Sequence, residues 1–233
     1  MFTVSDSAKK VSILVPTALL PRPLRVKSRE QLLSRLEVAI ARRAGLLIIG
    51  HPKSGNTWLK VMLARLYQVR HGFNASELIG SDELALRNPA IPRLAATNAV
   101  YSYEGAVGRI LAAGAPDDPL RHKPVMLLAR NPIDIAVSWF FQFTKRQSAH
   151  KQELINHFID HPIDRHTVGM WDFVRHSDIG LPFLIDYLNT WECNIGELEN
   201  AAIVRYEDLR SDTAETLKKI TVLMGETFSN EEI

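Results

Sequence analysis

The feature that most constrains the fold of this chain is a short apolar run that leads through a glycine-containing loop into an amphipathic helix. The run occupies residues 46–49 (LLII), and the loop occupies residues 50–57 (GHPKSGNT). Beyond the loop, leucine and methionine recur at intervals of three and four residues, the spacing of one helix face. A strand that is apolar on both faces is typical of the centre of a parallel sheet, because helices cover both sides of such a sheet. These residues therefore predict a strand, a turn and a helix in that order.

The same unit occurs twice more along the chain. Residues 125–128 (VMLL) precede an Asn-Pro pair at 131–132, which supplies an N-cap and a proline suited to the first turn of a helix. Residues 201–204 (AAIV) precede Asp212, which we expect to cap the next helix. A further amphipathic helix is expected over 181–191. We therefore predict the α/β class, with a parallel sheet flanked by helices on both faces and a P-loop-like phosphate-binding turn. Ligands of such sheets bind at the carboxyl ends of the strands, where these turns lie.

The absence of repeats and of a Gly/Ser linker predicts one domain over residues 1–233, with a core of about residues 45–225. Residues 1–27 are expected to form an N-terminal arm. Ser28 and Gln31 have the spacing of a capping box, so a helix is expected to begin there.

The apolar run at residues 11–20 follows Lys9 and Lys10, an order that also occurs in secretory signal peptides. Pro16 and Pro21 interrupt the run, and no small-x-small cleavage site follows it. We therefore favour a buried strand or arm over a signal peptide.

Composition excludes several classes of protein. The chain has 233 residues, 46% of them hydrophobic, and a formal net charge of +2, so neither disorder nor recruitment of nucleic acid by a global field is expected. The single cysteine, Cys193, excludes an internal disulfide framework and suits a reducing compartment. No apolar run approaches the roughly 20 residues of a membrane span. These features predict a cytoplasmic protein with no membrane span.

The loop at residues 50–57 matches the phosphate-binding pattern GxxxxGK[ST] except that Asn56 stands where the lysine is expected. Backbone N–H groups around Gly55 and the dipole of the following helix still favour an anion. A lysine is present instead inside the loop, as Lys53. Without the usual lysine, γ-phosphate binding and nucleotide hydrolysis are disfavoured, so we expect a phosphate-bearing ligand that is not a magnesium–nucleotide complex. A plain βα turn with an exposed lysine is the alternative.

Three segments resemble motifs of the sulfotransferases that use 3′-phosphoadenosine 5′-phosphosulfate (PAPS). PKSGNTW at 52–58 resembles the loop that binds the 5′-phosphosulfate, ARNPIDIAVS at 129–138 resembles the 3′-phosphate motif, and VRYEDL at 204–209 resembles a late strand-end segment. The chain is thus identified from its sequence as similar to this family over most of its length. The resemblance implies that PAPS is the co-substrate, that adenosine 3′,5′-bisphosphate (PAP) is the product, and that no metal is needed. The residues implied to bind the nucleotide are Lys53, Ser54, Gly55, Asn56, Thr57, Trp58, Arg130, Ser138 and Tyr206.

The implied reaction is in-line transfer of a sulfuryl group from PAPS to a hydroxyl or amine of a small-molecule, glycan or lipid acceptor. Charge accumulates on the leaving 5′-phosphate, and Lys53 is the cation expected to stabilise it. The family usually supplies a general base as histidine in a Lys-Thr-His segment, where this chain has Ala96, Thr97 and Asn98. An amide cannot accept a proton at neutral pH, so Asn98 is not the base.

Three explanations for the missing histidine stay open. Another side chain serves as the base, with Glu104 nearest in sequence and His51 nearest the phosphate loop. Alternatively, the acceptor ionises easily, or the chain is a catalytically silent relative that binds PAPS, PAP or a partner protein. A small-molecule kinase is a further alternative that Asn56 disfavours.

The sequence departs from the family pattern again at its end. Family members usually continue into an Arg-Lys-Gly segment that closes over the nucleotide, whereas this sequence stops at Ile233, as a short member or as a truncated one. The histidines between 150 and 176 carry no cysteine or fixed third ligand, so a metal site is not expected there. The acceptor and the oligomeric state have no readable signal.

Overall fold

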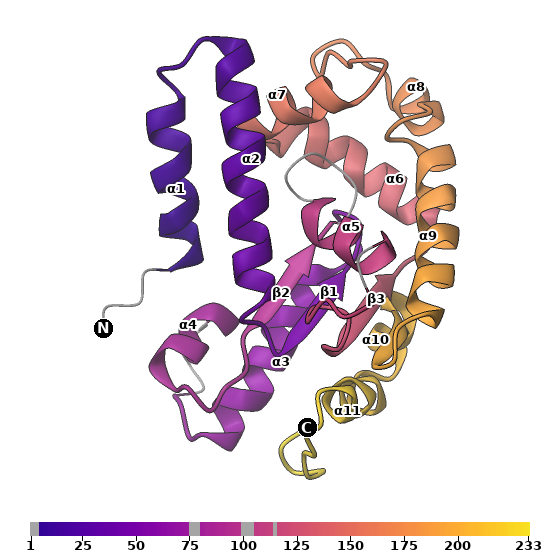
Figure 1. Cartoon of the computed structure of the whole chain (residues 1–233). Coiled ribbons are helices and arrows are strands. Elements are labelled where there is room, and N and C mark those ends of the chain that lie inside the picture. Colours follow the sequence, from indigo (N-terminus) through magenta and orange to yellow (C-terminus); the bar gives the residue numbers. More distant parts are fainter. Residues whose placement is uncertain (1–4, 75–79, 99–104, 114–115) are drawn as a thin grey trace.

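The computed structural model describes residues 5–74, 80–98, 105–113 and 116–233 (Figure 1). Its helices and strands follow the chain in this order: α1 (Asp6–Thr17), α2 (Arg22–Ala41), β1 (Leu46–Ile49), α3 (Asn56–Arg70), α4 (Ser81–Arg87), β2 (Leu94–Thr97), α5 (Ala106–Ala113), β3 (Val125–Ala129), α6 (Pro132–Phe141), the π-helical turn η2 (Gln142–Arg146), α7 (Ala149–Phe158), α8 (Met170–Arg175), α9 (Leu181–Gly196), β4 (Ala201–Arg205), α10 (Tyr206–Ser211) and α11 (Thr213–Leu223). No helix within these ranges combines the length and the apolar character of a membrane span.

The described strands form one parallel sheet with the order β2-β1-β3-β4. Strand β1 lies between β2 and β3, with Ile49 in register with Thr97 on one side and with Leu127 on the other. The carboxyl ends of these three strands therefore lie side by side. The predicted α/β class and the three predicted strand–turn–helix units are confirmed.

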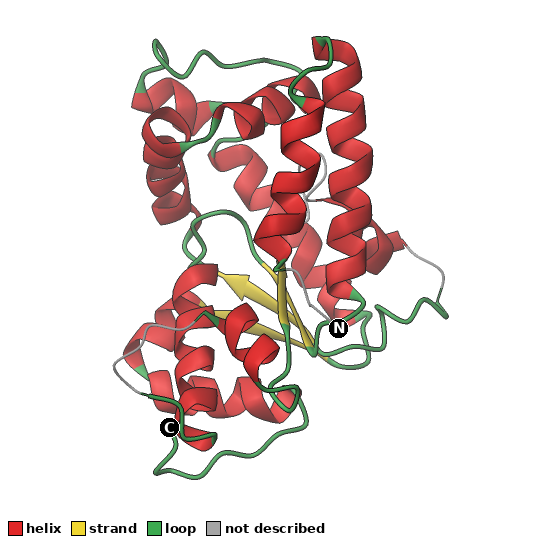
Figure 2. Ribbon diagram, turned by 90° about the vertical axis from the view of Figure 1, so that its left-hand side faces the viewer, coloured by secondary structure: helices red, strands yellow, loops and turns green. Residues whose placement is uncertain are grey.

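Helices cover both faces of the sheet because alternate residues of each strand point to opposite faces. On one face, Leu47 and Ile49 pack with residues of α2, α5 and α9. On the other face, Leu46 and Ile48 pack with residues of α3, α10 and α11. Figures 1 and 2 show that further helices extend beyond one end of the sheet, so that the strand ends face a mainly helical part of the molecule.

Two helix caps expected from the sequence are present. The Asn131 side chain accepts a hydrogen bond from the backbone N–H of Ile133 at 2.9 Å, and Asp212 does the same for Glu215 at 3.2 Å. Each cap satisfies an N–H group that has no partner within its own helix. The Asn131 cap lies in the turn after β3, as the sequence predicted; Asp212 caps α11 as predicted, but α10, which was not predicted, lies between β4 and this cap.

The N-terminal region differs from its prediction. Residues 6–17 form the helix α1, and Val11 and Val15 are exposed, so the expected buried strand is wrong. Helix α2 begins at Arg22, directly after Pro21, and Ser28 lies inside it, so the expected capping box is wrong as well. Pro23 lies in the first turn of α2, where a backbone N–H would have no partner within the helix, so it favours this early start.

Charged side chains, of which Arg29 is buried, attach the α1–α2 hairpin to the rest of the molecule. Arg29 of α2 donates hydrogen bonds to the Thr17 hydroxyl at 3.0 Å and to the Leu14 carbonyl at 3.3 Å. Glu153 of α7 accepts hydrogen bonds from Arg25 at 3.0 Å and from Arg29 at 3.2 Å, and Arg25 holds the pKa of this carboxyl below its usual range. The hairpin is thus fixed relative to α7, which borders the functional site described next.

Candidate functional site

The loop between β1 and α3 has the backbone of a phosphate-binding turn. Gly55, the residue before the first turn of α3, has a φ of +110°, and Lys53 has a φ of +79°. A Cβ atom on Gly55 would lie 2.6 Å from Cδ2 of Tyr206, closer than real Cβ atoms approach other groups. Glycine is therefore required here for two reasons, the left-handed backbone and the aromatic ring above it.

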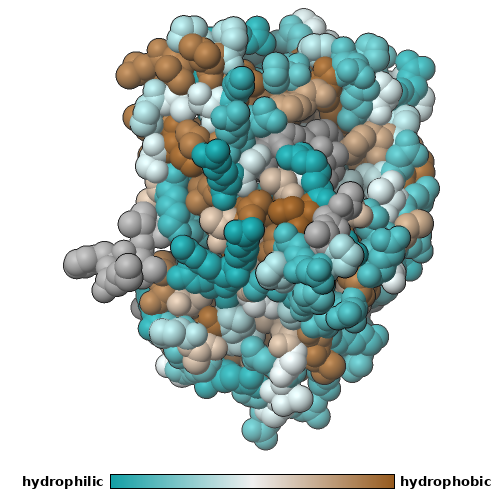
Figure 3. Space-filling view, viewed as in Figure 1, coloured by the Kyte–Doolittle hydropathy of each residue, from teal (hydrophilic) through white to brown (hydrophobic). Residues whose placement is uncertain are grey.

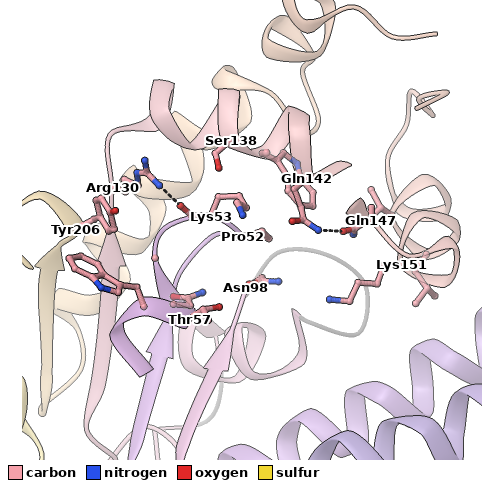
Figure 4. Close-up of a pocket in the computed structure, with 16 residues that line it drawn as sticks. Pro52, Lys53, Thr57, Asn98, Arg130, Ser138, Gln142, Gln147, Lys151 and Tyr206 are labelled. Atoms are coloured by element: carbon pink, nitrogen blue, oxygen red, sulfur yellow. Dashed lines mark hydrogen bonds between the residues drawn. The ribbon is translucent and has the colours of Figure 1, made fainter. Parts of the chain in front are cut away.

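Arg130 connects this loop to the turn after β3. Its guanidinium Nη1 donates a hydrogen bond to the carbonyl oxygen of Lys53 at 2.9 Å, and its Cζ lies 4.4 Å from the ring centroid of Tyr206 (Figure 4). These contacts bring together three segments that are far apart in the sequence. The three motifs found in the sequence thus meet at one edge of the sheet.

A cavity of about 470 Å³ opens at this meeting point. Figure 4 shows Lys53, Thr57, Arg130 and Ser138 around it, with Asn98, Gln142, Gln147 and Lys151 on the side away from Tyr206. All but one of the residues implied to bind the nucleotide line the cavity: Lys53, Gly55, Asn56, Thr57, Trp58, Arg130, Ser138 and Tyr206. Ser54, the exception, is fully buried in the loop.

Several buried polar atoms at this site have no hydrogen-bond partner among the described residues. They are Oγ of Ser54, Oδ1 of Asn56 and Nε of Arg130. An unpaired buried polar group costs free energy, and such groups are rare in folded proteins. These three atoms are half of the unpaired buried side-chain atoms in the described part of the chain; the others belong to Ser34, Trp139 and Tyr187.

The aromatic residues of the site contact each other. The rings of Trp58 and Tyr206 lie 5.4 Å apart, centre to centre, with an angle of 58° between their planes. Since 38% of the Trp58 surface is exposed, its indole offers a free face beside the cavity. A flat heterocycle stacks favourably on such a face.

His51 is not placed as a catalytic base requires. It is fully buried, does not line the cavity, and makes edge-on contacts with Trp139 and Tyr187. Its Nδ1 lies 2.8 Å from the carbonyl oxygen of Pro52, and burial lowers the pKa of its imidazole to about 4. The structure thus argues against His51 as the base. The other expected base, Glu104, lies outside the described residues.

A second cavity of about 400 Å³ adjoins the first and shares Asn56, Thr57, Asn98 and Lys151 with it. Glu37 of α2 also lines it. One oxygen of this carboxylate accepts a hydrogen bond from the Thr97 hydroxyl at 2.5 Å, and the other accepts one from the Ala106 N–H at 3.0 Å. Glu37 therefore holds the end of β2 and the start of α5 in place.

The sequence analysis missed part of the lining of the first cavity. Gln142 lies four residues after Ser138, one helical turn further on the same face, and this spacing is a signal that would have found it. Gln142 donates a hydrogen bond to Gln147 at 3.4 Å. Lys151 comes from α7, where no motif marks it. In the described ranges, no three His, Cys, Asp or Glu side chains gather closely enough to hold a metal ion.

Known proteins resemble this chain over most of its length. A model of the sulfotransferase domain family matches residues 44–233. The chain belongs to the sulfotransferase domain family. Among its relatives, cytosolic sulfotransferase 14 of Arabidopsis thaliana is 29% identical over 78% of this chain and 53% of its own length. Sulfotransferase 6B1 of Danio rerio is 26% identical over 89% of this chain and 66% of its own length.

The sulfotransferase match begins after the α1–α2 hairpin, which occupies residues 6–41. This chain spans about half the length of the Arabidopsis relative. A crystal structure of a mouse sulfotransferase complexed with PAP aligns with 85% of this chain and 66% of its own, at a TM-score of 0.48 and 18% identity.

Proposed function

We propose that this chain transfers the sulfuryl group of PAPS to a hydroxyl or amine of an acceptor molecule. The observation that carries the proposal is the hydrogen bond from Arg130 to the Lys53 carbonyl, which joins the two predicted phosphate-binding turns at the edge of one cavity. Membership of the sulfotransferase domain family supports it.

In the proposed complex, the nucleotide lies across the three turns. The N–H groups at the start of α3 and the Lys53 ammonium hold the 5′ end, while Arg130 and the Ser138 hydroxyl hold the 3′-phosphate. The adenine stacks on the exposed face of Trp58, next to Tyr206. Arg130 lines the cavity and its guanidinium already contacts the loop at the Lys53 carbonyl, so its remaining N–H groups are the proposed donors to the 3′-phosphate.

The proposed reaction forms one sulfur–oxygen or sulfur–nitrogen bond and breaks another. The acceptor atom attacks sulfur, the bond to the 5′-phosphate oxygen breaks, and this oxygen keeps the electron pair. Lys53 stabilises the charge that grows on the leaving phosphate, an interaction that is stronger in the transition state than in the ground state. The acceptor proton passes to a base, and Glu104 remains our proposal for that base. No metal has a role in this scheme.

The strongest alternative is a silent relative that binds the nucleotide without turnover, because Asn98 borders the cavity and is not a base. The kinase alternative is weaker. Asn56 donates a hydrogen bond to the Gly50 carbonyl at 3.2 Å, so the position of the usual loop lysine presents an amide instead of an ammonium group. We further propose a cytoplasmic location, which the name of the Arabidopsis relative supports.

The test combines calorimetry with transfer from ³⁵S-labelled PAPS to a panel of phenols, sugars and lipids. We expect PAP to bind with about micromolar affinity. Lys53→Met should lower the transfer rate about 100- to 1000-fold, the usual cost of losing one group that stabilises transition-state charge. Lys219→Met, an exposed lysine on α11 outside the cavity, is the matched control and should retain full activity.

The outcomes separate the alternatives. Absence of binding at millimolar PAP would overturn the proposal. Binding without transfer to any acceptor would favour the silent relative. Loss of transfer in Glu104→Gln, with PAP binding retained, would support Glu104 as the base.

A further inference from the structure

The second cavity has walls from a part of the chain that the family match does not include. Lys10 of α1 and Leu33, Glu37, Ile40 and Ala41 of α2 line it, and all five precede residue 44. The rest of the lining comes from β1, β2 and the residue after it, the start of α3, α5 and α7. The α1–α2 hairpin thus forms one wall of a compartment that opens beside the phosphate loop.

Apolar and polar contacts hold the hairpin against α7. Ile13 and Leu14 of α1 pack with Val26 and Leu33 of α2 and with Leu154 of α7. The hydrogen bonds of Arg29 and Glu153 described above add polar contacts to this packing. Figure 1 shows α1 and α2 side by side along one edge of the molecule, next to β2.

The charged groups that line this second cavity are mostly positive. Among the residues that the structure describes, three lysines line it, Lys10, Lys60 and Lys151, together with one carboxylate, that of Glu37. Both oxygens of Glu37 already accept hydrogen bonds from Thr97 and Ala106. Figure 3 shows hydrophilic side chains next to apolar ones around a hollow in this face of the molecule, as expected for a cavity with a charged rim.

Lys10 and Lys60 are two lysines of this cavity whose ammonium groups have no partner in the described part of the chain. Among the described residues, neither ammonium group makes a hydrogen bond or an ion pair, whereas the adjacent Lys9 pairs with Asp6 at 2.7 Å. Lys60 is half-buried on α3, and burial lowers the pKa of its amine. The charge of Lys10 also lowers this pKa, whereas the carboxylates of Asp82 and Asp6 raise it. Desolvation of the Lys60 ammonium costs free energy, and an anion bound in the cavity would offset this cost.

We propose that the second cavity binds the acceptor and that Lys10 and Lys60 select an acceptor with an anionic group, a carboxylate or a sulfate, next to its reacting hydroxyl or amine. This inference rests on the proposed function, which places the nucleotide in the adjoining cavity. Asn56, Thr57, Asn98 and Lys151 border both cavities, so an acceptor in the second one has direct access to the sulfuryl end of the first. The N-terminal hairpin, through Lys10, thereby contributes to acceptor selection.

The test uses 4-hydroxyphenylacetate and its neutral isostere 4-hydroxyphenylacetamide as probes, titrated calorimetrically into the full chain with and without saturating PAP. The acid should bind at least tenfold more tightly than the amide. Lys10→Met and Lys60→Met keep the aliphatic stem and remove the charge, so each should reduce this preference about three- to tenfold. Lys60→Arg, which keeps the charge, should retain most of it.

Lys9→Met is the matched control, because Lys9 lies next to Lys10 on α1 but does not line the cavity. This variant should keep the full preference for the acid. Circular dichroism and the melting temperature of each variant show whether it is folded. Equal affinity for acid and amide, or a preference that survives in the Lys10→Met/Lys60→Met double variant, overturns the inference. If PAP gives no heat, the proposed function fails separately, and the titration without PAP still measures the selectivity of the lysine pair.

Discussion

Replacement of Gly55 by alanine tests the central geometry of the site. The residue has a φ of +110°, which strains any residue with a Cβ atom by about 1–3 kcal/mol. The new Cβ would also lie 2.6 Å from Cδ2 and 3.0 Å from Cε2 of Tyr206, so the ring must move. Overpacking of this kind costs about 1–3 kcal/mol more. The free energy of unfolding should therefore fall by about 2–6 kcal/mol.

The same substitution should weaken PAP binding. The Tyr206 ring contacts the Trp58 ring and the Arg130 guanidinium, and Arg130 in turn bonds the loop at Lys53. Displacement of the ring therefore disturbs the proposed adenine and 3′-phosphate contacts together. We expect PAP affinity to fall at least tenfold in calorimetry at a temperature where the variant is folded.

A matched glycine separates the two contributions to stability. Gly72 has a φ of +65°, and a Cβ atom added there would meet nothing within 4 Å, so Gly72→Ala should cost only about 1–2 kcal/mol. In a Tyr206→Ala background, Gly55→Ala should cost about 1–3 kcal/mol less than in the wild type, because the ring is gone. The reasoning is refuted if chemical denaturation gives Gly55→Ala the same cost as Gly72→Ala, or the same cost with and without the ring.

Two further predictions concern single side chains. The protein should bind PAP about 10- to 100-fold more tightly than adenosine 5′-monophosphate, and Arg130→Met should abolish most of this difference, because the lost interaction is with the 3′-phosphate. The control Arg205→Met, at the neighbouring strand end, should keep the difference. A retained difference in Arg130→Met would contradict our placement of the nucleotide. His51 has its pKa lowered to about 4 by burial, so the unfolded chain binds its proton at higher pH than the folded chain does. The stability that the neutral imidazole contributes, about 3 kcal/mol, is complete above pH 6.5 and is lost as the pH falls towards 4. His51→Gln should flatten this part of the curve of unfolding free energy against pH, and an unchanged slope would show that His51 is not buried in the neutral form.

The sequence predicted the parts of the fold whose causes are local. Strands β1 and β3 are continuous apolar runs, and the caps at Asn131 and Asp212 depend on residues within three positions of them. Strand β2 (Leu94–Thr97) was not predicted, because a four-residue segment with two alanines has little strand propensity and pairs only through its register with β1. The meeting of the three motifs at one edge of the sheet was predictable because each motif lies at or just after the end of a strand.

The second cavity was not predictable in this way. Lys10, Glu37 and Lys60 belong to three different helices, and no motif relates them. They meet because α2 packs on the sheet and because Arg29 and Glu153 fix the hairpin, which are contacts between residues far apart in the sequence. The start of α2 at Arg22 was also missed, because the sequence analysis took Ser28 as the N-cap and did not use the nearby prolines as a sign of an earlier start.

Lys53 has a backbone conformation that glycine would adopt without strain, at a φ of +79°. Selection for thermal robustness alone would therefore favour Lys53→Gly, a substitution that would relieve about 1 kcal/mol of strain. A strained lysine at this position is expected if its ammonium group acts on the leaving phosphate, as we propose. Laboratory evolution for heat resistance, without selection for turnover, should lose this side chain early.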